Sequence, residues 1–294
     1  MSLSAINVWW LAIRPKTLAA SLSPVLMGTA MAYGAGFFDS LIFVVTLGCA
    51  LLIQILTNFI NDLYDFKNGV DTTERMGPTR VTQSGLATPK QMMVAIVFVL
   101  ILITAGAFYL VTIGGKPIAL IGILSILSAY LYTAGPLPLS YLGLGEIFVF
   151  AFFGPVAVAG TYLLQTLEFD PIVVMAGIAP GLFSVAILTV NNLRDIVTDK
   201  KVGKKTLAVR FGPDFAKAVY FYSILGACSI PVILYLMTQD YPSALYASLI
   251  FIFFFPLFRA VMTNQDGPSL NGVLAKTGRW LLIYSVAFSI GWLM

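Results

Sequence analysis

The chain has 294 residues, of which 59% are hydrophobic and only 10% are charged, whereas a soluble globular domain carries about 25% charged residues. This composition predicts an integral membrane protein whose main partner is the lipid bilayer, and nothing in it indicates nucleic-acid binding. The sequence contains no histidine, which excludes His-ligated haem or zinc and catalysis by Ser-His or Cys-His pairs. Any chemistry must therefore use carboxylates, amides, Lys, Arg and Tyr.

Nine apolar runs are long enough to cross a membrane as helices, since about 20 helical residues span the hydrocarbon layer. They are expected at 17–35, 41–62, 92–113, 117–134, 144–165, 172–193, 216–237, 243–263 and 273–293. We therefore predict an all-α, polytopic membrane protein. Residues 1–294 would form a single domain, in which nine transmembrane helices make one bundle.

The loop charges predict the orientation of this bundle. Of the 17 Lys and Arg residues, only Lys116 falls on the side opposite to the others. Because cytoplasmic loops are enriched in Lys and Arg, we expect a cytoplasmic N-terminus and an external C-terminus in the cell membrane. Two cytoplasmic loops, about 63–91 and 194–215, are longer than the rest. Loops of this length in compact proteins are usually functional, so we expect them to cap a site.

Three aspartates, Asp62, Asp65 and Asp71, crowd the end of the apolar run that begins at Leu41. Charged side chains at bilayer depth are energetically costly and by default mark a functional site. A second polar cluster ends the sixth apolar run. An offset of 130 residues superposes several residues of the two clusters and of the loops that follow, namely Asn61 on Asn191, Asp65 on Asp195, and Arg80 on Arg210. This internal similarity predicts two pseudo-repeated, Asp-rich halves.

The spacing within the clusters predicts metal binding. Residues four apart share a helix face, so Asn191, Asp195 and Asp199 would form one stripe. In the first cluster, Asn61 and Asp65 are also four residues apart. Asp71 can turn back toward them only if the helix ends before it. Oxygen ligands without His or Cys suit Mg²⁺, which takes one or two carboxylates and is completed by water and substrate phosphates. Mg²⁺ is therefore the expected cofactor.

Basic residues follow each cluster along the chain. They are Arg75 and Arg80 after the first cluster, and Lys200, Lys201, Lys204, Lys205 and Arg210 after the second. Arg clamps phosphates in a bidentate manner and Lys acts as a point charge, although the charge bias of cytoplasmic loops would also supply such residues. A lipid diphosphate would place its head at the metals and its tail among the helices. These features do not separate binding from catalysis, and they leave a secondary transporter or a membrane scaffold as alternatives.

The two clusters resemble the Asp-rich motifs of the UbiA superfamily of intramembrane prenyltransferases, which read N-D-x-x-D followed by a further Asp, and D-x-x-x-D. Within that superfamily the chain is most similar to the 1,4-dihydroxy-2-naphthoate polyprenyltransferases of menaquinone biosynthesis. The matching segments, beyond the Asp-rich motifs, are Arg14–Thr17, Gly77–Arg80, Tyr132–Gly135, Tyr141–Glu146, Phe152–Gly154 and Asn191–Asp195. The resemblance extends from Arg14 to about Trp280.

This resemblance implies a nine-helix bundle around a central cavity that the two long loops close. It also implies Mg²⁺-dependent transfer of a polyprenyl group from a polyprenyl diphosphate to 1,4-dihydroxy-2-naphthoate, with loss of CO₂ and diphosphate, giving demethylmenaquinol. Other aromatic acceptors of the superfamily are the alternatives within this fold: 4-hydroxybenzoate, homogentisate, haem and chlorophyllide. Neither the prenyl chain length nor the oligomeric state follows from the sequence.

The resemblance further implies roles for individual residues. The expected metal ligands are Asn61, Asp65, Asp71, Asp195 and Asp199. The expected catalytic residues are Asp62, Asp65, Asp195 and Tyr132. The expected substrate-binding residues are Arg14, Asn61, Arg75, Arg80, Asn191, Asn192, Lys201 and Lys205. Among these, Arg80 and Lys205 would clamp the diphosphate, and Asp62, Tyr132 and Arg14 would face the acceptor. Which of Asn191 and Asn192 touches a metal stays open.

Overall fold

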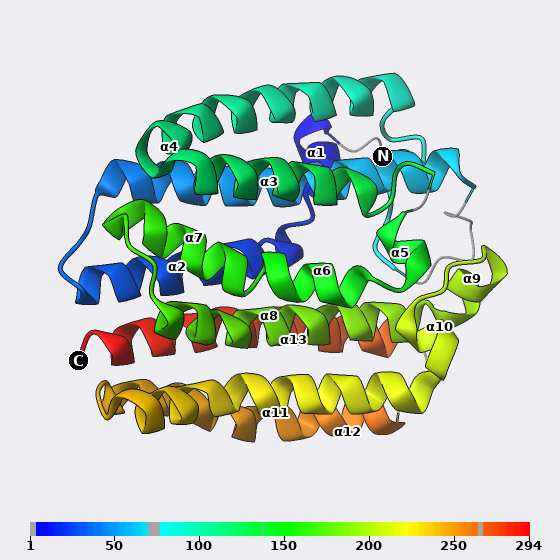
Figure 1. The fold of residues 1–294 in the computed structure, drawn as a ribbon. Coiled ribbons are helices and arrows are strands. Elements are labelled where there is room, and N and C mark those ends of the chain that lie inside the picture. The colour runs from blue at the N-terminus through cyan, green and yellow to red at the C-terminus, as the bar shows by residue number, and fades with distance from the viewer. Residues whose placement is uncertain (1–3, 70–76, 137, 264–266) are drawn as a thin grey trace.

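The computed structural model describes residues 4–69, 77–136, 138–263 and 267–294, and over these residues all regular structure is helical. Figure 1 shows the long helices running roughly alongside one another in a layered bundle. The α-helices and the two 3₁₀ segments (η) are α1 (Ala5–Ile13), η1 (Pro15–Thr17), α2 (Ala19–Gly34), α3 (Ser40–Lys67), α4 (Pro89–Leu131), α5 (Leu139–Leu142), α6 (Gly145–Phe152), α7 (Pro155–Thr166), α8 (Pro171–Arg194), α9 (Ile196–Lys201), α10 (Leu207–Phe211), α11 (Pro213–Thr238), η2 (Pro242–Phe254), α12 (Phe255–Thr263) and α13 (Gly267–Trp292).

Within the described residues, seven helical segments are long and apolar enough to cross a membrane. One of them, α4, has 43 residues, and a straight helix of that length would measure about 64 Å, roughly twice the hydrocarbon thickness. It is not straight, because Gly115 adopts φ 63° and ψ −148° and the chain reverses direction there (Figure 1). The break predicted between residues 113 and 117 falls at this glycine. Helix α2, with 16 residues around Pro24, is shorter than the seven.

The segment expected as one helix at 144–165 is divided into α6 and α7 at Gly154. This junction lies directly against α8. A methyl group on Gly154 would come within 2.6 Å of the carbonyl oxygen of Gly177 and within 2.7 Å of the α-carbon of Gly181. Small residues allow helix backbones to approach closely in membranes, so these glycines set the distance between α8 and the α6–α7 pair.

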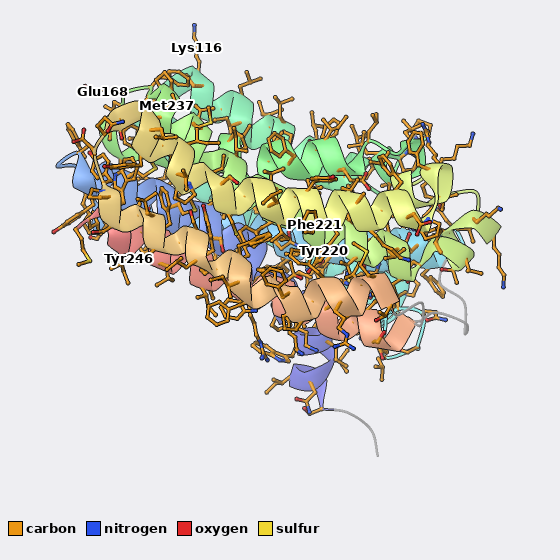
Figure 2. All side chains as sticks on the ribbon, turned by 90° about the horizontal axis from the view of Figure 1, so that it is seen from below. Lys116, Glu168, Tyr220, Phe221, Met237 and Tyr246 are labelled. Atoms are coloured by element: carbon orange, nitrogen blue, oxygen red, sulfur yellow. The ribbon has the colours of Figure 1, made fainter. Side chains whose placement is uncertain are left out.

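Three apolar cores hold the bundle together. The largest core joins α2, α7, α8, α11, η2, α12 and α13 around fully buried side chains such as Phe183, Tyr220 and Tyr284. The hydroxyl of Tyr220 makes a 3.0 Å hydrogen bond with Thr277 of α13, and Tyr220 and Phe221 lie in the N-terminal half of α11, away from the end that carries Met237 (Figure 2). A second core joins α1, α3 and α4 around Leu56 and Met92. A third and smallest core joins α3, α4 and α7 around Leu110 and Leu164. Helices of all three cores line the central cavity described below.

The two ends of the bundle differ in structure. At one end the short helices α5, α9 and α10 gather around the C-terminal ends of α3 and α8 (Figure 1). The described parts of the long loops that follow α3 and α8 are therefore at the same end. Lys116 and Glu168 both lie at the other end (Figure 2). The clusters predicted at the ends of the second and sixth apolar runs are thus brought to one end of the molecule.

Candidate active site

A cavity of about 390 Å³ lies between α2, α3, α4, α6, α7 and α8. Much of its wall is apolar, with side chains such as Ile53, Leu110, Ile121 and Phe152. The lining also includes polar and charged side chains, many of them from the ends of α3 and α8 and from the loops: Arg14, Asn61, Asp65, Arg80, Tyr132, Asn191, Asn192, Asp195, Asp199 and Lys204. The cavity therefore combines an apolar volume with a charged region, which suits an amphipathic lipid.

Asp65 of the first cluster is paired with two basic side chains. Helix α3 carries it close to its C-terminal end, which Asn68 caps, and it is only 3% exposed. Arg80 Nη2 lies 3.0 Å from its Oδ2, and Lys204 Nζ lies 3.4 Å from its Oδ1. Lys204 belongs to the loop after α9, so this contact joins the two halves of the sequence. Asn61, one turn earlier, accepts a hydrogen bond from the hydroxyl of Thr133.

Asp62 contacts a loop in this arrangement, in contrast to the expectation that it faces the acceptor. It is 3% exposed, and its Oδ2 and Oδ1 accept hydrogen bonds from the backbone N–H groups of Val81 and Thr82 at 3.0 and 2.9 Å. The reason is helix geometry, because a three-residue step leaves the side chains of Asp62 and Asp65 about 60° apart around the helix. Asp62 therefore holds the loop that carries Arg80.

The second cluster is interrupted at Asp195. Helix α8 ends at Arg194, Asp195 adopts φ −96° and ψ 8°, and α9 begins at Ile196. The predicted stripe of Asn191, Asp195 and Asp199 is therefore not carried by one continuous helix, although all three residues line the cavity. The break between α8 and α9 still leaves the carboxylates of Asp195 and Asp199 at the charged region.

Arg194, for which the sequence motifs predict no role, is the central residue of this cluster. It is buried, and its Nε donates to Asp195 Oδ1 at 2.8 Å, with a second contact from Nη2 to Oδ2. The same guanidinium donates to Asn191 at 2.8 Å and to Asn271 of α13 at 2.7 Å. The only sequence signal for it is an Arg placed directly before the motif aspartate.

Asn192 and Tyr132 also line the cavity. The amide of Asn192 donates a 2.9 Å hydrogen bond to the buried carboxyl of Glu146 in α6. Because this contact fixes the amide nitrogen, the amide oxygen is the atom of Asn192 that is left for another partner. Tyr132 follows α4, and a methyl group on Gly145 would come 3.3 Å from its hydroxyl.

The four lysines that follow the second cluster divide into one that lines the cavity and three that are exposed. Lys204 lines the cavity beside Asp65, whereas Lys200, Lys201 and Lys205 are exposed. The family motif favours Lys205 as the diphosphate clamp, but the backbone N–H of Lys205 bonds to the carbonyl of Tyr141 at 3.2 Å and it is Lys204 that reaches Asp65. The pattern KKVGKK does not distinguish these residues, because the path of the loop decides which of them turns inward.

Arg80 and Arg210 are equivalent in the 130-residue offset but not in their contacts. Arg80 binds Asp65, while Arg210 donates to the backbone carbonyls of Leu142 and Lys205 at 2.7 and 2.9 Å. Arg210 thereby ties the α5 loop to the α9–α10 loop. Asp71 and Arg75, which the sequence predicts in the site, lie outside the described residues.

Arg14 lies at an elbow between α1 and η1 and adopts the left-handed conformation, φ 56° and ψ 65°, which is uncommon for a residue with a side chain. Its carbonyl accepts a hydrogen bond from the hydroxyl of Thr17 at 2.9 Å. Asn58 of α3 donates to the carbonyl of Ile13 at 2.9 Å and to Thr17 at 3.1 Å, and Gln54 donates to Thr17 at 3.3 Å. This polar network holds Arg14 at the cavity wall.

The charged region contains both signs of charge in close contact. Among the described residues, no three Asp, Glu, Cys or His side chains lie close enough together to hold a metal ion by themselves. Asp65, Asp195 and Asp199 with the amide of Asn61 nevertheless provide only oxygen ligands, as Mg²⁺ prefers. A ligand that contributes phosphate oxygens would complete such a coordination sphere.

The model of the UbiA prenyltransferase family matches residues 21–293. The chain belongs to the UbiA prenyltransferase family. Among its relatives, the 1,4-dihydroxy-2-naphthoate octaprenyltransferase of Haemophilus influenzae is 35% identical over 301 residues, covering 98% of this chain and 96% of the relative. The enzyme of the same name from Escherichia coli is 34% identical over 299 residues, with the same coverage.

A solved UbiA homologue supports the same fold. The structure of a UbiA homologue from Archaeoglobus fulgidus bound to GPP and Mg²⁺ has a TM-score of 0.69 at 18% identity, covering 97% of this chain and 99% of that chain. At this level of identity the likeness concerns the fold. The chain is thus an integral membrane protein with the helical architecture of the UbiA family.

Proposed function

We propose that this chain transfers a polyprenyl group from a polyprenyl diphosphate to 1,4-dihydroxy-2-naphthoate, releasing CO₂ and diphosphate and giving demethylmenaquinol. The observation that carries this proposal is the similarity of nearly the whole chain, at 35% and 34% identity, to two enzymes named for octaprenyl transfer to this acceptor. The cavity supports it, because its apolar volume suits a prenyl tail and its charged region suits a diphosphate.

The proposed reaction breaks the bond between the prenyl C1 and the diphosphate oxygen. A carbon–carbon bond forms between that C1 and the ring carbon that bears the carboxylate, and loss of CO₂ from this carbon restores the aromatic ring. The allylic cation that develops must be kept from water. Apolar side chains of the cavity wall, such as Ile53 and Phe152, are suited to exclude water there.

Mg²⁺ is the proposed cofactor, and the Archaeoglobus homologue is described as bound to GPP and Mg²⁺. Asn61 and Asp65 would hold one ion, and Asp195 and Asp199 another, with Asp71 as a further candidate. Asn61, Asp65, Asp195 and Asp199 line the cavity and offer oxygen ligands. Bound together with the diphosphate, the metal supplies the charge that stabilises the departing group.

The proposed diphosphate clamp consists of Arg80 and Lys204, which already lie beside Asp65. Lys204 takes the role that the family motif predicts for Lys205. The planar guanidinium of Arg80 can donate hydrogen bonds to two phosphate oxygens, and the ammonium of Lys204 supplies a point charge. Arg75 and Lys201 remain proposed as weaker contributors from the same loops.

Arg14 is the proposed partner of the acceptor carboxylate. Its guanidinium is permanently charged, it lines the cavity, and the Thr17–Asn58 network fixes the backbone that carries it. Tyr132 is proposed to contact an acceptor hydroxyl from the C-terminal end of α4. Asn191 and Asn192 are proposed to contact substrate, with Asn192 offering its amide oxygen because Glu146 holds its nitrogen.

We further propose nine crossings in one domain, counting α4 as two and α2 as one in addition to the remaining long segments. The two halves would be pseudo-repeats, and the loops 63–91 and 194–215 would cap the site. Helix α9, which carries Lys200 and Lys201, gathers with α10 at one end of the bundle, and Lys116 lies at the other (Figures 1 and 2). This distribution supports a cytoplasmic active site and an external C-terminus in the cell membrane.

The test uses detergent-purified protein with Mg²⁺, polyprenyl diphosphates of several lengths and each aromatic acceptor in turn. Product from 1,4-dihydroxy-2-naphthoate is expected, and product only from another acceptor would contradict the assignment. Asp65→Ala and Asp195→Ala should abolish Mg²⁺-dependent diphosphate release, whereas Asp214→Ala, at the exposed start of α11, should not. A transporter would release no diphosphate in detergent, where no gradient exists.

A further inference from the structure

Three basic side chains at the charged region are already bound to its carboxylates. Arg80 and Lys204 contact Asp65 at 3.0 and 3.4 Å, and Arg194 contacts Asp195 at 2.8 Å. All these side chains are well shielded, with exposed fractions of 6% for Arg80, 13% for Lys204, 1% for Arg194 and 14% for Asp195. Asp65 and Asp195 therefore each have their own counter-cation.

Arg194 is fixed in this position by further contacts. Asn191 and Asn271 accept two of its hydrogen bonds at 2.8 and 2.7 Å, so its guanidinium is held by residues of both α8 and α13. A guanidinium does not lose its proton in proteins, which means that the positive charge beside Asp195 is permanent. Lys204 is less constrained, since its loop position and flexible stem allow it to leave Asp65.

These contacts make the binding of a metal ion alone unfavourable. A divalent ion that binds Asp65 or Asp195 must compete with the basic side chains already paired with that carboxylate. If it displaces them, these basic side chains stay shielded from water without a carboxylate partner, and burying an unpaired charge is energetically costly. No group of three metal-ligating acidic, Cys or His side chains within the described residues compensates for this. A diphosphate removes the conflict, because it brings the negative charge that the displaced cations need and the oxygens that the metal lacks.

We propose that Arg194 and Lys204 are counter-cations that couple the two ligands, so that Mg²⁺ and the diphosphate bind the site tightly only together. This inference rests on the metal assignment in the proposed function and adds Arg194 as a positioning residue for Asp195. Coupling of this kind is reciprocal, since each ligand must raise the affinity of the other by the same factor. Removing a counter-cation should therefore tighten metal binding in the absence of diphosphate and reduce the coupling.

The experiment measures Mn²⁺ binding to the full-length protein in detergent by electron paramagnetic resonance, with and without inorganic pyrophosphate. Mn²⁺ binding to pyrophosphate in solution is subtracted with a protein-free titration. Wild-type protein should bind Mn²⁺ at least about tenfold more tightly when pyrophosphate is present, within the usual range of coupling between sites. Lys204→Met should bind Mn²⁺ alone about fivefold more tightly than wild type and show correspondingly weaker coupling.

Arg194→Met should shift Mn²⁺ binding in the same direction at the second motif. Should this buried substitution prevent folding, Lys204→Met decides the question, because Lys204 lies in a loop. The matched control is Lys217→Met, a lysine paired at 3.3 Å with the exposed Asp214 on α11, and it should leave both affinities unchanged.

Equal Mn²⁺ affinity with and without pyrophosphate in wild type would overturn the inference. An unchanged or weaker affinity for Mn²⁺ alone in folded Lys204→Met would overturn it as well. The two proposals fail in different ways. Wild-type protein that prenylates the acceptor without metal–pyrophosphate coupling contradicts only this inference, while coupling without acceptor prenylation supports it and contradicts the proposed acceptor.

Discussion

Replacing Asp62 by Asn tests whether this carboxylate serves the acceptor or the loop. In the structure its two oxygens accept hydrogen bonds from the N–H groups of Val81 and Thr82, directly after Arg80. The turn continues through hydrogen bonds from Ser84 to the Arg80 carbonyl. Asn offers one carbonyl oxygen and one NH₂ group, so one of the two loop N–H groups would face a donor.

The magnitude follows from the burial of Asp62, which is 3% exposed. A hydrogen bond to a charged group contributes about 1.5–3 kcal/mol, and the Asn variant loses the charge at both contacts and one acceptor outright. We therefore expect about 2–4 kcal/mol of local destabilisation. Because about 1.4 kcal/mol is a factor of ten, the fraction of molecules with an opened loop should rise by roughly 30- to 700-fold. Arg80 would then leave Asp65 more often.

The assay compares the KM values for the two substrates and the rate of limited proteolysis in the loop between α3 and α4. Asp62→Asn should raise the KM for prenyl diphosphate and speed up cleavage of the loop, while the KM for the acceptor stays close to wild type. An increase confined to the acceptor KM, with unchanged proteolysis, would refute the anchoring role and restore the acceptor role that the family motif predicts.

Three further substitutions address helix packing, the Arg14 elbow and the choice of lysine. Gly28→Ala would place a methyl carbon 2.5 Å from a backbone oxygen of α7 and should destabilise the protein by about 1–3 kcal/mol, seen as a lower thermal midpoint in detergent. Gly48→Ala has nothing within 4 Å of the new methyl, so an equal loss there would contradict this packing argument. Asn58→Leu removes the two hydrogen bonds that hold the elbow and should raise the acceptor KM by roughly five- to tenfold; an equal rise in the prenyl diphosphate KM would argue against a specific effect on the acceptor. Lys204→Met should raise the prenyl diphosphate KM by about fivefold or more because it removes a charge-assisted contact, whereas Lys205→Met, on the exposed neighbour, should change it little, and the reverse order would favour Lys205 as the clamp.

The sequence was sufficient to predict the membrane class and the position of most helices, and it placed the candidate site at the ends of the second and sixth apolar runs. The physical reason is that hydrocarbon thickness demands apolar runs of a fixed length, and carboxylates at the end of such runs are too costly without a purpose. The break in α4 was also predictable, because Gly115 tolerates a positive φ. For the same reasons, the sequence alone pointed to Asn61, Asp65 and Asp195 as site residues, and all three line one cavity.

Tertiary structure alone decided which side chains meet. Whether Lys204 or Lys205 turns inward depends on the path of the loop after α9, and the contacts of Asp62 depend on a loop that returns to α3 from 19 residues away. The pairing of Arg194 with Asp195 and Asn271 required the end of α8 to be brought against α13. Such contacts depend on where a helix stops and how a loop folds back, whereas hydrophobic runs and residue spacing specify only the helices themselves.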